Sequence, residues 1–365
     1  MRDGLDRRGR GRLPLTGGFF LRPAASGRGG KIRERLPALS ILSPPPGVLN
    51  GRGGGPRGVS LFSTPSVSLP AVREIAILDA PSNLGLRPPG PGLVPGVYKL
   101  GWALRSASLP LRLGAREAGV VLPPRYDPET DGHTPRNLDA LVRYSRMLAD
   151  RVGPLVEAGS FALILGGDCS ILIGTMLALR RRGRYGLAFL DGHLDFRHPG
   201  NSPSVGAAAG EDLALVTGRG PRELTHLEDR GPLVLAKDVV ALGSRPDDEY
   251  RGEVEGCGVE VVDVPGLRRE GTRSAGDRVA AGLLARGVSG FFVHLDVDLL
   301  DPTVMPAVDA PAPGGLTFEE LSDLLRPLVA SPGAVGLEVT VFDPDLDEDG
   351  RLARQLADAL VRALG

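Results

Sequence analysis

Three potential metal ligands follow one apolar segment at alternate positions. In the stretch LAFLDGHLDFRHPGN (187–201), Asp191, His193 and Asp195 come directly after a short apolar run. An extended segment points alternate side chains to the same side, so we expect these three groups to converge on one point. Carboxylate and imidazole groups gathered at a strand end contribute little to a hydrophobic core. They are well suited to binding a cation.

Two further segments end in the same way. LILGGDCS (163–170) carries Asp168 and Cys169 after an apolar run, and VHLDVDLLDP (293–302) carries Asp296 and Asp298, with His294 on the same face. Five or more carboxylates in one crevice would repel one another strongly, and two cations balance that charge better than one. Carboxylate-rich sites with one or two nitrogen ligands suit Mn²⁺-like ions, and a two-metal site can generate hydroxide from water at neutral pH.

Apolar segments alternate with amphipathic ones along most of the chain. Strands are expected at 74–80, 161–168, 186–193, 238–244, 259–264, 290–298 and 334–344, and helices at 137–159, 171–182, 317–330 and 351–364. Strands that are apolar throughout, separated by helices, predict an α/β fold with a mostly parallel sheet covered on both faces. Ligands of such sheets bind beyond the carboxyl ends of the strands, where the three ligand segments lie.

Composition separates an N-terminal extension from a globular body. Of 365 residues, 42% are hydrophobic and 24% charged, as in a soluble globular protein. Residues 1–72 are rich in Gly, Pro and Arg and are expected to be disordered, so we place the catalytic domain at 73–365. The first 60 residues hold 12 basic and 3 acidic side chains, and the remainder holds 31 basic and 41 acidic. An acidic body without aromatic residues among its charges argues against a nucleic-acid partner.

The sequence also carries expectations about location. No apolar run of 18 or more residues is present, which argues against a membrane partner, and the N-terminus lacks a secretory signal pattern. The two cysteines, Cys169 and Cys257, are too few for a disulfide framework and suit a reducing compartment. We therefore expect a cytoplasmic protein.

The ordered motifs GGDCS (166–170), DGHLD (191–195) and HLDVDLLDP (294–302) resemble the signature segments of the arginase/agmatinase/formimidoylglutamase (ureohydrolase) family. PAPGGLTFEEL (311–321) and EVTVFDPDLD (338–347) are similar to the segments that follow in that family. The resemblance implies a three-layer α/β/α sandwich. It also implies hydrolysis of guanidino or amidino carbon–nitrogen bonds by a hydroxide that bridges two metal ions, with Mn²⁺ as the first expectation and a homo-oligomer, trimeric or hexameric.

The resemblance assigns roles by position. It implies that the metal ligands are Cys169, Asp191, His193, Asp195, Asp296 and Asp298, with Asp191, Asp195 and Asp296 as bridging carboxylates. Asp195 would also accept the proton of the nucleophile and pass it to the leaving amine. We further expect the substrate to contact Arg197, Asn201, Thr317 and Glu338.

Three positions depart from the family pattern. Cys169 stands where most members have a histidine, and its thiolate would favour Zn²⁺ or Fe²⁺ over Mn²⁺ unless it is simply a small buried side chain. Ala209 stands where arginases have a proton-shuttling histidine. Val341 stands where the family has a glutamate that holds the guanidinium group. Three residues are candidates to replace the proton-shuttling histidine: His198, which we take as the catalytic candidate, Glu211 and Asp212.

These observations leave several functions open. The first is arginase-like release of urea from L-arginine or a related compound. The second is hydrolysis of an acidic amidino substrate, because HLDFR (193–197) resembles the formimidoylglutamase motif, in which an arginine meets substrate carboxylates. A member of the family that kept the fold and lost its chemistry is a third. A nucleic-acid-binding protein, suggested only by the basic N-terminal segment, is a distant fourth.

Overall fold

A computed structural model describes residues 73–365 of the chain. The expected N-terminal extension, residues 1–72, lies outside the described residues. Within the described part, no helix combines the length and apolar character needed to cross a membrane.

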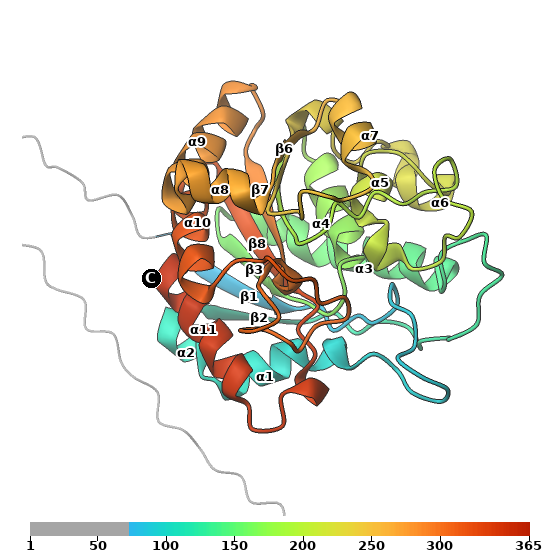
Figure 1. The fold of residues 1–365 in the computed structure, drawn as a ribbon, viewed down its shortest axis with the longest axis horizontal. Coiled ribbons are helices and arrows are strands. Elements are labelled where there is room, and N and C mark those ends of the chain that lie inside the picture. The colour runs from blue at the N-terminus through green and yellow to red at the C-terminus, as the bar shows by residue number, and fades with distance from the viewer. Residues whose placement is uncertain (1–72) are drawn as a thin grey trace, which may run out of the picture. The chain divides into compact units, whose positions relative to one another are not determined.

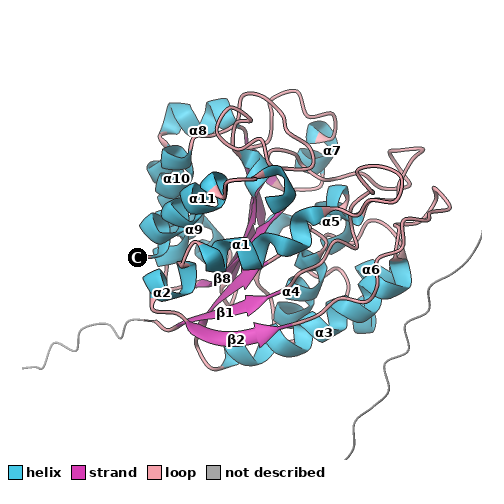
Figure 2. Cartoon of the chain, turned by 90° about the horizontal axis from the view of Figure 1, so that it is seen from below, coloured by secondary structure: helices cyan, strands magenta, loops and turns pink. Residues whose placement is uncertain are grey.

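Eight parallel strands form one sheet in the order β2-β1-β3-β8-β7-β4-β5-β6. The strands are β1 (Ile75–Asp79), β2 (Arg116–Val120), β3 (Phe161–Leu165), β4 (Gly186–Leu190), β5 (Val239–Leu242), β6 (Glu260–Val262), β7 (Phe291–Asp296) and β8 (Ala334–Thr340). The central strands β3, β8, β7 and β4 are buried along almost their whole length. Because all strands run the same way, their carboxyl ends share one edge of the sheet (Figure 2).

Helices cover both faces of the sheet (Figure 1). One face packs against α1 (Leu100–Ser106), α2 (Leu109–Leu113), α8 (Val264–Glu270), α9 (Thr272–Ala285), α10 (Phe318–Ala330) and α11 (Arg351–Leu364). The other packs against α3 (Leu138–Glu157), α4 (Ile171–Arg180), α5 (Asp212–Val216), α6 (Arg222–Thr225) and α7 (Arg251–Gly256). Two separate apolar clusters, one on each face, make up the core. The three-layer α/β/α sandwich expected from the sequence is confirmed.

The elements that the sequence pattern missed are those with weak apolar periodicity. Strand β2 has the sequence REAGV at an edge of the sheet and is largely exposed, so it lacks the apolar run of a central strand. Helix α9 contains two glycines and several polar residues, which lower its helix propensity. Its position is set by packing against α10 and the sheet.

A tight turn joins β3 to α4 and fixes the position of Cys169. A Cβ atom added at Gly167 would lie 1.7 Å from the carbonyl oxygen of Ser82, so only glycine fits there. The carboxylate of Asp168 accepts hydrogen bonds from the Ser82 hydroxyl and from the backbone N–H groups of Gly85 and Ser170. Asp168 therefore holds the turn together and is not free to bind an ion.

We expect Gly167→Ala to destabilise the protein by about 3 kcal/mol or more, because the added methyl group meets backbone and not a flexible side chain. The matched control is Gly282→Ala in α9, where nothing lies within 4 Å of the added Cβ. That substitution should be neutral or stabilising by up to about 1 kcal/mol. Urea unfolding of both variants measures the difference, and equal midpoints would contradict the steric argument.

Candidate metal centre and active site

Four neighbouring strand ends bring the predicted metal ligands together. Cys169 follows β3, Asp191 follows β4, and Asp296 is the last residue of β7. Strand β8 lies between β3 and β7 and ends at Thr340. Asp296 is more than 100 residues from Cys169 and Asp191 along the chain, and the parallel sheet places all three on one edge.

The first group of ligand atoms consists of Asp191, His193 and Asp195. One atom from each lies within 4.8 Å of the other two, so the predicted convergence is confirmed. The predicted extended backbone is wrong: β4 ends at Leu190, and the chain then bends. Asp195 has a positive φ of 42°, and the His193 N–H donates to Asp191 Oδ1 (2.7 Å). The bend, not strand alternation, turns the three side chains toward one another.

The second group consists of Cys169, Asp191 and Asp296, again with ligand atoms within 4.8 Å. The Cys169 thiol donates to Asp296 Oδ2 (2.9 Å) and lies 3.0 Å from Thr340 Oγ1. Asp191 belongs to both groups. Two adjacent ion positions that share one carboxylate are therefore compatible with this arrangement.

Asp298, the sixth predicted ligand, lies against the first group. Its Oδ1 accepts a hydrogen bond from the Gly192 N–H (3.1 Å), and its Oδ2 lies 3.0 Å from His193 Nδ1. The hydrogen bond to Asp298 raises the pKa of His193 to about 9. Without a cation, a proton on His193 thus offsets part of the negative charge of the site.

The carboxylates themselves are strongly perturbed. Burial, reinforced by repulsion from neighbouring carboxylates, raises the pKa values of Asp191 and Asp296 well above their ordinary range. Burial chiefly raises the pKa of Asp195 to about 7. Among the described residues, Asp191 Oδ2 has no hydrogen-bond partner. Buried carboxylates without counter-charges are costly, so these residues fit bound cations.

A cavity of about 580 Å³ opens above the ligand groups. His193, Asp195, Asp296 and Asp298 line it, whereas Cys169 and Asp191 lie behind its wall. Its other charged lining residues are Arg87, Arg197, Arg245, Asp247, Asp248, Glu249 and Asp309. The cavity can therefore hold a small substrate that carries charges of both signs, next to the cation-binding groups.

The arginines of the cavity differ in their contacts. Arg245 is buried, and its guanidinium donates to backbone carbonyl groups, among them those of Asp298 and Ala312. It holds the surrounding loops. Arg197 is half-buried, with its Nε 3.5 Å from the hydroxyl of Tyr250, and it faces the cavity. Arg197 is thus placed where the sequence predicted, as a cation available to a ligand.

The structure does not bring His198 or Asn201 into the cavity. His198 Nε2 lies 2.8 Å from Glu253 Oε1, and the Asn201 amide donates to Glu253 Oε2. Asn201 also accepts a hydrogen bond from the His198 N–H. These contacts fasten the loop after Arg197 to α7. Glu211, another candidate for the proton shuttle, accepts hydrogen bonds from two backbone N–H groups and does not line the cavity either.

Two other predicted substrate contacts also have structural partners. Thr317 is the N-cap of α10, where its hydroxyl and the Glu320 carboxylate form a reciprocal capping box. Glu338 is fully buried and binds Thr175 and His294. Neither residue lines the cavity, and Val341 does. Val341 has a φ of +72°, which is unusual for a β-branched side chain.

The sequence analysis missed Asp248, which lies beside the first group. Asp248 follows β5 and accepts a hydrogen bond from the Leu194 N–H through Oδ2 (3.0 Å). This bond supports the bend between Asp191 and Asp195. The acidic run Asp247–Glu249, separated from the end of β5 by four residues, was the available signal, because acidic residues also follow the other strands of the site.

We expect the metal-free protein to lose thermal stability as the pH rises from 5 to 9. Folding raises the pKa of Asp195 to about 7 and that of His193 to about 9. The stabilisation tied to each bound proton is complete below the ordinary pKa of the group. It is lost as the pH passes the raised value, so both groups act in the same direction.

The melting temperature of chelator-treated protein measures this effect across the range, with Asp195→Asn as the matched variant. The variant should lose the part of the slope between about pH 4 and 7. Added divalent cation should raise the melting temperature at pH 8 more than at pH 5. A melting temperature that rises with pH in the metal-free protein would contradict this account.

The comparisons with known proteins agree with the geometry. A family profile described as the arginase family matches residues 95–365. An arginase of Agrobacterium fabrum is 32% identical over 313 residues, which cover 79% of this chain and 89% of that protein. An arginase of Brevibacillus brevis is 29% identical over 285 residues, covering 77% and 94%. The crystal structure of an arginase from Bacillus caldovelox superimposes with a TM-score of 0.71 at 28% identity, covering 80% of this chain and 98% of that one.

Arginase-family enzymes are metal-dependent, which the ligand groups of this chain match. The chain therefore belongs to the arginase family, and this assigns it to the hydrolases that act on carbon–nitrogen bonds of linear amidines.

Proposed function

We propose that the protein is a dinuclear ureohydrolase that cleaves a small guanidino compound, L-arginine or a close relative, into urea and an amine. The observation that best supports this proposal is that two groups of ligand atoms share Asp191 beside a cavity of small-molecule size. The curated relatives described above are named arginases, which favours this substrate class. A cytoplasmic location and a homo-oligomeric state stay predictions from the sequence.

Five of the six proposed ligands fall into the two groups, and Asp298 adjoins the first through His193. The first group has hard oxygen and imidazole donors, which suit Mn²⁺. The second includes the thiol of Cys169, which favours Zn²⁺ or Fe²⁺ at that position. Two ions bound there would lower the pKa of a water molecule and so supply a nucleophile at neutral pH.

Asp195 has the position and the acidity for proton transfer. It lines the cavity, and burial raises its pKa to about 7. A group with a pKa near the working pH serves best both to accept and to return a proton. Hydrolysis adds water to the amidine carbon and breaks a carbon–nitrogen bond. Asp195 would take the proton from the attacking water and give it to the departing amine nitrogen.

We expect the protein to bind about two divalent ions per chain and to release urea from a guanidino substrate. Asp191→Asn should lower kcat by at least about a thousandfold and reduce the metal content, because Asp191 belongs to both ligand groups. The control is Asp229→Asn, which changes an exposed carboxylate that pairs with Arg222 and does not line the cavity. Elemental analysis together with a urea assay gives both readouts. Fewer than two ions per chain and no urea or amine release would contradict the proposal.

A second candidate is an acidic amidino substrate, and Arg197 is the observation that favours it. Its guanidinium faces the cavity, and the pairing with Tyr250 leaves donors free for a carboxylate. Val341 supplies no carboxylate at the position where the family resemblance places a guanidinium-binding glutamate. This departure weakens the case for a guanidinium held as in arginases.

If the substrate carries a carboxylate, Arg197→Ala should raise KM about 10- to 100-fold and change kcat little, because a charge-assisted hydrogen bond to the substrate is lost. Arg222→Ala, an exposed arginine outside the cavity, serves as the control. Steady-state kinetics with L-arginine and with N-formimidoyl-L-glutamate compares the two candidates. If neither KM nor kcat moves in the Arg197 variant with either compound, Arg197 plays no part in substrate recognition.

A further inference from the structure

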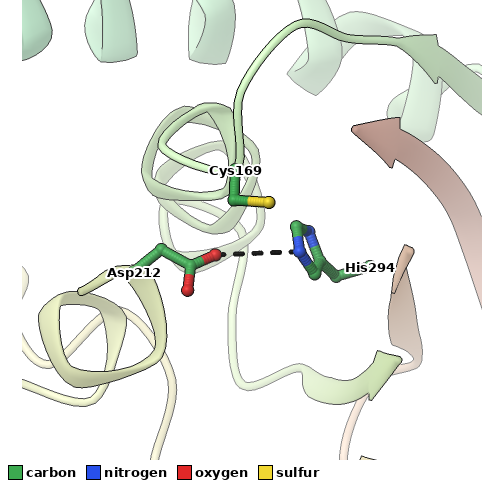
Figure 3. A group of neighbouring side chains, drawn as sticks. All are labelled: Cys169, Asp212 and His294. Carbon is green, nitrogen blue, oxygen red and sulfur yellow. Dashed lines mark ion pairs between the residues drawn. The ribbon is translucent and has the colours of Figure 1, made fainter. Parts of the chain in front are cut away.

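A third group of ligand-type side chains lies behind the wall of the cavity. It consists of Cys169 from the β3–α4 turn, Asp212 at the start of α5, and His294 in β7, which point toward one another (Figure 3). Their ligand atoms lie within 4.8 Å of one another, and all three side chains are fully buried. Neither Asp212 nor His294 belongs to the six ligands proposed above.

The polar atoms of this group are left without partners. Within residues 73–365, neither carboxylate oxygen of Asp212 nor Nε2 of His294 has a hydrogen bond. His294 Nε2 and Asp212 Oδ2 are 3.7 Å apart, too far for a hydrogen bond of their own. Each buried polar group left unsatisfied costs about 1–3 kcal/mol. One oxygen of Asp212 and Nε2 of His294 face each other and the Cys169 thiol, an arrangement that a bound cation would satisfy.

His294 is oriented as metal-binding histidines are. Its Nδ1 lies 2.7 Å from Glu338 Oε1, because β7 and β8 pair with His294 opposite Glu338. The other oxygen of Glu338 accepts a hydrogen bond from the Thr175 hydroxyl (2.7 Å), and the ring of Phe189 stacks on the imidazole at 4.9 Å. A carboxylate on one ring nitrogen fixes the tautomer and directs the other nitrogen toward a metal ion.

We propose that Cys169 Sγ, an oxygen of Asp212 and His294 Nε2 bind one zinc-type divalent ion. Thiolate, imidazole and carboxylate are the donor types of protein zinc sites, and the thiolate disfavours Mn²⁺. The thiolate and the Asp212 carboxylate would balance the two charges of the ion, with the carboxylates of Asp296 and Glu338 next to the site. Binding releases the thiol proton to solvent.

This site goes beyond the proposed function, because it depends neither on the substrate nor on turnover. It assigns the thiol of Cys169 to this ion and not to the second group, so the two catalytic ions proposed above would be held by Asp191, His193, Asp195, Asp296 and Asp298. Asp296 connects the two regions: it lines the cavity, and its Oδ2 lies 2.9 Å from Cys169 Sγ. An ion that enters the cavity is therefore one side chain away from the buried group.

The test uses the full chain, stripped of metal with a chelator and titrated with Co²⁺ as a spectroscopic substitute for Zn²⁺. A thiolate–cobalt bond produces a charge-transfer band in the near ultraviolet, and the chain has only two cysteines, Cys169 and Cys257. The wild type should show the band with one equivalent of Co²⁺. Asp212→Asn, which preserves the shape of the side chain, and His294→Gln should lose the band or weaken Co²⁺ binding at least tenfold.

Two matched variants locate the ion. Cys257→Ser should keep the band, because Cys257 lies elsewhere and contacts Arg219. Asp191→Asn should also keep it while losing hydrolysis, so failure of the hydrolase proposal is distinguishable from failure of this site. Zn²⁺ should raise the melting temperature of the wild type more than that of Asp212→Asn, which keeps the first ligand group. The melting transition also shows whether the variant folds.

Two outcomes would overturn the proposal. A band that persists in Asp212→Asn and His294→Gln and disappears in Asp191→Asn would place the thiolate with Asp191 and Asp296. Absence of any charge-transfer band in the wild type would mean that Cys169 binds no metal ion.

Discussion

Mutual repulsion among buried carboxylates is the constraint on which this structure depends. Asp191, Asp195, Asp296 and Asp298 come from two strand ends, and the fold holds them together in largely buried positions at the floor of the cavity. Burial and neighbouring charges raise the pKa values of the first three. An arrangement of this kind stabilises a protein only when cations neutralise it. The same arrangement is what a metal-dependent hydrolase needs, so the functional requirement and the destabilising feature coincide.

The sheet topology creates this concentration of charge. Strands β8 and β7 lie between β3 and β4, although they come last along the chain. Their insertion brings the loops after β3, β4 and β7 to one crevice at the carboxyl edge, which is where open parallel sheets bind ligands. The backbone then adds local corrections: the glycine at 167 permits the turn before Cys169, and the Asp248 carboxylate supports the bend that aims Asp191 and Asp195.

The three departures from the family pattern lie close together. Cys169 packs against Thr340 in β8, Val341 directly follows that strand, and Asp212 lies three residues beyond Ala209. His294 and Glu338 occupy paired positions in the adjacent strands. A thiol at 169 leaves room and preference for a softer ion, while a buried aspartate and an oriented histidine supply further donors. Their proximity favours one altered metal environment over the independent loss of three functional side chains.

The sequence by itself determined the fold class and indicated which strand ends carry the proposed ligands. Continuous apolar runs at β3, β4 and β7 are the signal of buried parallel strands, with Asp191 directly after β4 and Asp296 at the end of β7. The convergence of His193 and Asp195 with Asp191 depends on a bend after β4 that the sequence pattern did not predict. Arg197 lines the cavity, and its role in substrate binding stays a prediction. Only the tertiary structure decided that His198 and Asn201 bind Glu253 and that Glu338 supports His294. It also brought Asp212 to Cys169 and His294 from a separate part of the chain. The capping box of Thr317 and Glu320, in contrast, is a local sequence pattern. The end of a strand can be recognised from the local sequence pattern. Contacts between side chains from different strands and loops depend on the strand order and on the path of the loops, which no local pattern encodes.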